Sequence, residues 1–196
     1  MPTLYVSARD FARVIVSVSL ATCTLLAHAA PASLALFGTQ LKGASRTELR
    51  QTLTKAGLRP QRVDSSYFCD EYGVNGKLKG ASILTVCYTE GDNRFASAQY
   101  TFPGFMNMQL VQRVIETVKS KYGPPASMSG DIGLGPVSAR WPMAQGMEIR
   151  VSRGWPDTTT YLDLVDEANL DKMHAQMQAD KKAAIHQQAE KDSNAF

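Results

Sequence analysis

The residues in this sequence best suited to chemistry are a set of soft metal ligands, Met173, His174 and Met177. The two methionines are one helical turn apart and the histidine is adjacent, so two thioethers and an imidazole could bind Cu(I). The alternative is that both methionines, with Leu170, form the apolar stripe that docks a helix, because methionine is an adaptable core residue. We favour the stripe and keep the metal site as an alternative.

Catalytic motifs are missing from the sequence, since it has no H-E-x-x-H, G-x-S-x-G or P-loop pattern. After residue 29 the histidines are His174 and His186, both in a polar C-terminal segment, which disfavours a Ser-His-Asp triad. Asp70 and Glu71 are adjacent, so on a strand they would point to opposite faces. We therefore expect no enzyme and no cofactor, with a small hydrolase or metal-handling protein as the alternative.

Aromatic side chains are the candidates for binding another protein, because they anchor many interfaces. The candidates are Trp155, Trp141 and Tyr161. Trp155 is the strongest, since it lies in the Gly-Trp-Pro-Asp turn over residues 154–157 and turn residues are seldom buried. The other aromatic residues are expected mainly in the core.

Two cysteines follow the first thirty residues, Cys69 and Cys87. They form no C-x-x-C motif and have no histidine nearby, which disfavours a redox or metal-binding thiol pair. An even pair in an exported chain is typical of a disulfide. Closing a loop of this length stabilises the fold by about 3 kcal/mol.

The N-terminal residues have the pattern of an export signal. Two arginines precede an uncharged, largely apolar run over residues 14–26, and two Ala-x-Ala sites follow. The run is too short to span a bilayer, so it indicates a signal peptide over residues 1–29, or cleavage as late as residue 32. A lipid anchor at Cys23 is the alternative, disfavoured because the preceding threonine is atypical. The protein is predicted to be periplasmic or secreted, with no transmembrane segment after cleavage.

Hydrophobic spacing divides the remaining chain into two similar halves, residues 43–103 and 106–166. Each begins with a helix that has an apolar stripe and continues with three strand-like segments separated by turns. The first helix starts at a capping box formed by Ser45 and Glu48 and ends at Gly57. Because the helix ends and last strands recur at nearly constant offsets, we predict a duplication.

The predicted fold class is α+β, with two tandem α-β-β-β units over residues 30–166 whose antiparallel sheets are each covered by a helix. Residues 167–196 are polar and rich in alanine, which predicts a C-terminal helix or tail. The chain has 21 Lys and Arg against 18 Asp and Glu, a net charge of +3 spread along 196 residues. This small charge disfavours a nucleic-acid partner.

The first helix and its flanks resemble a known unit. Residues 43–45 (Gly-Ala-Ser), with Glu48, Leu53 and Gly57, are similar to the helix-plus-three-strand unit of the BamE/SmpA envelope lipoproteins and of the tandem β-lactamase-inhibitor-protein fold. The second unit departs from that pattern at residues 105–107 (Phe-Met-Asn) and in a glycine-rich stretch further on. The resemblance implies a non-catalytic binding or assembly module whose partner is another envelope protein.

Overall fold

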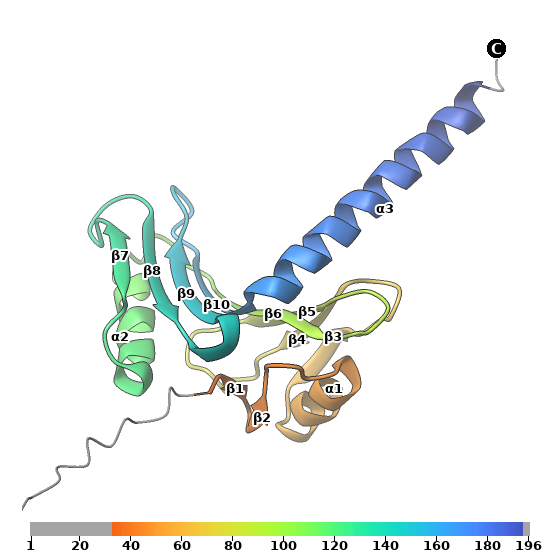
Figure 1. The fold of residues 1–196 in the computed structure, drawn as a ribbon. Helices are drawn as coiled ribbons and strands as arrows, with labels where there is room; N and C mark the ends of the chain where they lie inside the picture. The colour runs from red at the N-terminus through yellow and green to blue at the C-terminus, as the bar shows by residue number, and fades with distance from the viewer. Residues whose placement is uncertain (1–32, 194–196) are drawn as a thin grey trace, which may run out of the picture. The chain divides into compact units, whose positions relative to one another are not determined.

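Ten strands and three α-helices make up the part of the chain that the computed structural model describes, residues 33–193 (Figure 1). In chain order they are β1 (Ala35–Leu36), β2 (Thr39–Gln40), α1 (Arg46–Lys55), β3 (Arg59–Arg62), β4 (Cys69–Gly73), β5 (Ile83–Tyr88), β6 (Phe95–Phe102), α2 (Leu110–Tyr122), β7 (Ser127–Gly130), β8 (Val137–Pro142), β9 (Met147–Arg153), β10 (Thr160–Asp166) and α3 (Glu167–Ser193). The predicted signal peptide, its two cleavage sites and Cys23 lie outside these residues. Within them, no helix has the length and apolar composition needed to cross a membrane.

Eight of the strands form one antiparallel sheet in the order β3-β4-β5-β6-β10-β9-β8-β7. The α+β class is therefore confirmed, but the prediction of a separate three-stranded sheet in each half is wrong. Each half contributes four strands, and β6 and β10 join the halves. The additional strands arise because β3 pairs with β4 at one edge, and because a turn after Gly130 separates β7 from β8 at the other.

One face of the sheet is apolar and carries the core. Leu84 and Val86 of β5, and Ile149 and Val151 of β9, are fully buried on this face. They belong to one cluster with the apolar stripes of α1 and α2. The helix residues in this cluster are Leu49, Leu53, Leu110, Val111, Val114, Ile115 and Val118. Both helices therefore cover the same side of the sheet.

The opposite face is polar. The strand registers align Glu71, Thr85, Gln99, Asp163 and Arg150 in one row across five neighbouring strands. Alternation of side chains along each strand places these residues away from the core. In an antiparallel sheet this pattern is typical of one face packed and one face solvated.

Local signals set the helix ends. The Ser45 hydroxyl accepts a hydrogen bond from the Glu48 backbone N–H at 3.2 Å, which confirms the N-terminal half of the predicted capping box. At the end of α2, Gly123 has a φ of 80°, a backbone conformation that glycine adopts without a steric penalty. The boundaries of these helices could therefore be predicted from a few polar and glycine residues.

The first turns of α3 dock on the polar face, beside β5 and β6. Met173 is buried there in a small cluster with Leu170 and the disulfide cysteines. Asn169 donates a side-chain hydrogen bond to the Phe95 carbonyl at 2.8 Å. From Met177 to the end of the described helix the side chains are exposed. The apolar stripe of α3 therefore serves to dock its first turns.

Candidate functional site

The predicted metal ligands are not brought together by the structure. Met173 is only 4% exposed and packs against the disulfide region, whereas His174 and Met177 are exposed. Within residues 33–193, no group of three His, Cys, Asp or Glu side chains is placed to hold a metal ion. Met173 and Leu170 therefore pack as the predicted apolar stripe, whereas Met177, its third predicted member, is exposed, and the Cu(I) site stays a prediction.

The predicted disulfide is present. Cys69 of β4 and Cys87 of β5 face each other directly across the two strands and are bonded through their sulfur atoms. Their side chains contact Met173 in the cluster beneath α3. The disulfide therefore fixes the part of the sheet on which the C-terminal helix docks.

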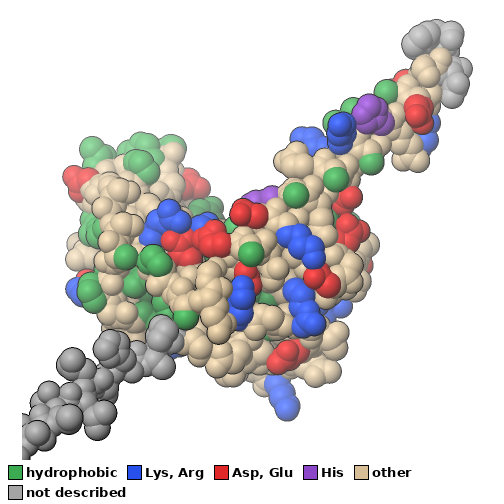
Figure 2. Space-filling model, in the orientation of Figure 1, with side chains coloured by type: hydrophobic (Ala, Val, Ile, Leu, Met, Phe, Trp, Pro, Cys, Tyr) green, Lys and Arg blue, Asp and Glu red, His purple; other side chains and the backbone are tan. Residues whose placement is uncertain are grey.

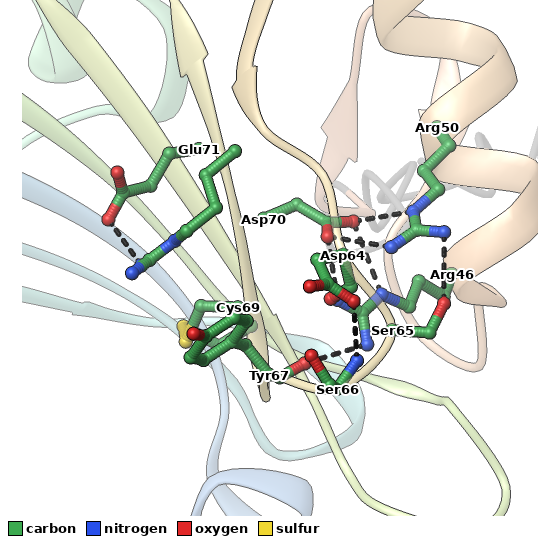
Figure 3. A network of polar contacts seen from close by, with 11 residues as sticks. Arg46, Arg50, Asp64, Ser65, Ser66, Tyr67, Cys69, Asp70 and Glu71 are labelled. Atoms are coloured by element: carbon green, nitrogen blue, oxygen red, sulfur yellow. Dashed lines mark hydrogen bonds and ion pairs between the residues drawn. A yellow bond between two sulfur atoms is a disulfide. The ribbon is translucent and has the colours of Figure 1, made fainter.

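A buried carboxylate, Asp70 of β4, lies between two arginines of α1 (Figure 3). Arg46 Nη2 is 2.6 Å from Asp70 Oδ1, and Arg50 Nε is 2.8 Å from Oδ2. Arg46 also donates to the backbone carbonyls of Asp64 and Tyr67 at 2.7 and 2.9 Å. This Arg46–Asp70–Arg50 cluster ties the helix and the loop before β4 to the sheet.

The electrostatics of this cluster indicate a structural role and not a role in acid–base catalysis. Burial alone would raise the pKa of Asp70, but hydrogen bonds and ion pairs with Arg50 and Arg46 hold it below its usual value. Burial raises the pKa of the neighbouring Tyr72 to about 12 and raises that of Tyr88 further. None of the three side chains is therefore poised to exchange a proton near neutral pH.

A second charged cluster lies on the polar face. Glu148 of β9 accepts hydrogen bonds from Arg140 at 2.6 and 2.8 Å and also pairs with Arg150, which in turn contacts Glu167 at the start of α3. Burial would raise the pKa of Glu148, but these partners lower it to about 2. The arrangement neutralises a buried carboxylate and links β8, β9 and α3.

Asp163 lies on the polar face without a cation within ion-pair distance among residues 33–193. Burial raises the pKa of its carboxyl, although Gln99 donates a 2.7 Å hydrogen bond to Oδ1. A carboxyl whose pKa is raised on folding stabilises the fold less as the pH rises through that value. Replacing Asp163 with asparagine should therefore raise the melting temperature at pH 7 but not at pH 3. Thermal unfolding at both pH values tests this, with the exposed Asp171→Asn as a control that leaves both temperatures unchanged.

The three predicted aromatic anchors occupy different environments. Trp141 is a core residue, because strand alternation on β8 places it on the same buried face as Val137 and Ala139. Its indole N–H donates to the Gly123 carbonyl at 2.9 Å. Tyr161 is half-buried on the polar face. Trp155 is 50% exposed and lies in a loop, so it is the most accessible of the three.

Trp155 belongs to a larger set of exposed apolar side chains at one end of the sheet. The strand registers bring the ends of β6, β9 and β10 and the β7–β8 turn to this end. Figure 2 shows hydrophobic side chains gathered at the end of the β7–β10 half. The loops there expose Phe105 (89%), Met106 (83%), Leu134 (65%) and Trp155 (50%). We call these four side chains the apolar tip.

Arg153 holds two of these loops in place. Its side chain is 2% exposed and uses all five N–H donors on backbone carbonyls. Four of the bonds go to Asp131, Ile132 and Gly135 in the β7–β8 turn, and the fifth goes to Met108 before α2. No carboxylate of residues 33–193 forms an ion pair with it. Carbonyl dipoles thus stabilise the buried charge and fix the loops.

The third loop is fixed by Thr158, in the turn between β9 and β10. Its hydroxyl accepts a hydrogen bond from the Met106 backbone N–H at 3.0 Å. The backbone of Gly104 approaches it so closely that a Cβ there would lie 2.1 Å from the Thr158 carbonyl oxygen. Only glycine fits at this contact. The three loops that carry the apolar tip are therefore tied to one another.

The charge beside the apolar tip is acidic. Asp131 and Asp157 are exposed in two of the loops, and each side chain caps its own turn by accepting a backbone N–H, at 2.7 and 2.9 Å. Residues 103–109, 131–136 and 154–159 contain no lysine or arginine. The tip is thus an apolar surface with an acidic border.

Sequence reasoning missed most of this site. It identified Trp155 but not Phe105, Met106 or Leu134, and it gave no role to Arg153. The available signal was the departure from the resembled pattern, because the Phe-Met-Asn segment and the glycine-rich stretch form two of the three loops.

Comparisons with known proteins leave the function open. No protein-family model matches this chain, and no curated protein matches it. Among solved structures it is similar to a DUF4309 family protein (YjgB) from Bacillus subtilis subsp. subtilis str. 168, at a TM-score of 0.43 and 14% sequence identity. The match covers 68% of this chain and 86% of that one. None of these comparisons points to the BamE/SmpA or β-lactamase-inhibitor-protein families.

Proposed function

We propose that this protein is an exported, non-catalytic binding module that holds a partner protein in the bacterial envelope through the apolar tip. The observation that carries the proposal is the exposure of four large apolar side chains on loops that Arg153 and Thr158 hold in place. Clustered exposed apolar side chains are typical of interaction sites. The N-terminal pattern supports export.

The fixed loops are what make the apolar tip suited to binding. A surface that is already ordered loses less conformational entropy on association, so more of the contact free energy remains as affinity. A tryptophan and a phenylalanine supply the side-chain types that dominate interface energetics. The acidic border favours a partner whose apolar pocket is surrounded by basic residues, and it disfavours an anionic membrane surface.

The strand order supports the predicted duplication. The sheet runs β3-β4-β5-β6 in one half and β7-β8-β9-β10 in the other, and the two last strands pair. Each half begins with a helix on the same face. On this proposal, two copies of one unit form the scaffold, and the loops of the second copy have acquired the binding role.

Replacing Trp155 with alanine is expected to weaken partner binding by about 2 kcal/mol, or roughly thirtyfold, the size of effect seen at interface anchors. A photo-crosslinking residue at position 134 would first identify the partner in the envelope. Affinity would then be measured by calorimetry between the purified partner and each variant. Ile185→Ala, which truncates an exposed apolar residue on α3, is the matched control and should bind normally.

Three results would contradict the proposal. One is an unchanged affinity for Trp155→Ala when the variant melts like the wild type. The second is that a crosslinker at position 134 captures the same proteins as a crosslinker at the control position 185. A specific binding site must enrich a partner that the control position does not capture. Binding of the wild type to anionic vesicles through the tip would also count against a protein partner.

A further inference from the structure

An apolar groove lies on the helix-covered side of the sheet, away from the apolar tip. Two adjoining cavities of about 250 and 180 Å³ share Leu78, Thr117 and Leu162 among their lining residues, and we call the two together the groove. Together they reach the size of the smaller ligand sites, about 300 Å³ and upward. The groove runs between α2 and the segment that precedes β5.

The groove exists because neither helix covers the middle of the sheet. The α2 helix contacts β8, β9 and β10, and α1 lies in the other half. At the junction of β6 and β10, the floor is left to side chains from the strands themselves. Its apolar lining includes Leu36, Leu78, Tyr100, Phe102, Leu162 and Leu164.

The rim of the groove is strongly basic. Lys77, Lys79, Arg113 and Lys121 line it, and no aspartate or glutamate does. None of these four side chains forms an ion pair with a carboxylate of residues 33–193. Four cations without counter-charges around an apolar groove create a positive potential that attracts anions. By contrast, Arg50 of α1, Arg140 of β8 and Arg150 of β9 each pair with a carboxylate.

The lining also limits the chemistry of the occupant. Apart from Tyr100, the inner surface offers few polar groups, because the Thr117 hydroxyl already donates to the Arg113 carbonyl at 2.8 Å. A peptide placed here would leave backbone N–H and C=O groups without partners, which is costly. An alkyl chain has no such groups and gains free energy from the burial of its surface.

We propose that this groove binds an anionic single-chain amphiphile, with the alkyl chain along the floor and the carboxylate or phosphate head at the four cations. The groove shares no residue with the apolar tip, so the inference is independent of the proposed partner protein. A carboxylate head would come from a free fatty acid and a phosphate head from a lysophospholipid. Charge complementarity at the rim is common to both.

Calorimetry with the full exported chain tests this proposal. The probes are palmitate, lysophosphatidic acid and hexadecyltrimethylammonium, each below its critical micelle concentration. Both anionic probes should bind with one site per chain, and the cationic probe should not bind. The tighter of the two anionic probes identifies the source of the ligand. Equal binding of the cationic probe, equal binding of an oligoglutamate peptide, or no binding of either anion would overturn the proposal.

Two variants test the groove itself. Lys77→Glu combined with Arg113→Glu reverses two rim charges and should weaken anion binding by about tenfold or more. Thr117→Trp places a large side chain over the groove from an exposed helix position and should abolish binding. Lys181→Glu on α3 is the matched control. Unchanged palmitate affinity in both groove variants, at wild-type melting temperature, would show that the site is elsewhere and overturn the assignment.

Discussion

Replacing Asp70 with alanine should lower the free energy of unfolding by about 3–5 kcal/mol. The variant leaves Arg46, which is 5% exposed, beside Arg50 with no carboxylate between them. Breaking a buried pair by removing one partner costs this much because the remaining charge is desolvated and repels its neighbour. Loss of the cluster should also release the loop before β4.

Denaturant unfolding of Asp70→Ala beside Glu71→Ala checks this expectation. Glu71 is the next residue on the same strand, but it faces the polar side and pairs with Arg62, a half-exposed arginine. Removal of such an exposed ion pair costs about 1 kcal/mol or less. A similar loss of stability in both variants would show that the cluster contributes only as a surface ion pair does.

We also expect the stability lost in Asp70→Ala to depend on pH. Because the pKa of Asp70 in the fold lies below its ordinary value of 3.8, its carboxylate stabilises the fold fully above about pH 4. This contribution is lost as the pH falls through the lower value in the folded state. The stability difference between wild type and Asp70→Ala should therefore be constant from pH 5 to 8 and shrink in stronger acid.

Replacing Arg153 with methionine should destabilise the fold by more than about 3 kcal/mol and disorder the apolar tip. The methionine keeps an apolar stem in the core but removes all five hydrogen bonds to loop carbonyls. Unpaired buried carbonyls are costly, so the β7–β8 turn should move outward to water. Arg153→Lys should recover little of the lost stability, because a lysine ammonium offers three donors from a single point and cannot reach carbonyls of two loops.

Hydrogen exchange and calorimetry separate the two effects of Arg153→Met. Exchange should accelerate at residues 131–135 and before α2 more than it does in α1. Partner affinity should fall even when Trp155 is intact, because the surface is no longer ordered before binding. Arg59→Met is the control, since this exposed arginine on the edge strand should leave both readouts unchanged. Unaltered exchange in the turn would mean that Arg153 does not hold it.

The sequence was informative wherever a local rule applied. The Ser45 cap of α1 and the Cys69–Cys87 disulfide were predictable, because the first depends on neighbouring residue types and the second on an even pair of cysteines. Strand alternation placed Asp70 and Glu71 on opposite faces, and they lie there in the structure. Strand alternation alone could not show which face of the sheet is buried. The spacing of Arg46 and Arg50, one helical turn apart, was the available signal for a shared carboxylate partner.

The parts that escaped prediction depend on contacts between distant segments. Arg153 could not be recognised, because its partners are backbone carbonyls that no sequence pattern marks. Trp141 could be misassigned because a tryptophan on a strand can face either side, and the β8 register decides it. The groove was also invisible, since its lining comes from β1, α2, β6 and β10 and from the segment before β5.

The junction of β6 and β10 has a consequence for the order in which the chain folds. All other pairings in the sheet join strands that are consecutive along the chain, so each half can assemble from short hairpins. The β6–β10 pairing instead joins residues such as Ser97 and Val165, which are far apart in sequence. The entropic cost of loop closure is therefore concentrated in one late step. Until that step occurs, β6 and β10 each present an unpaired edge, so this interval is when the folding chain is most exposed to aggregation.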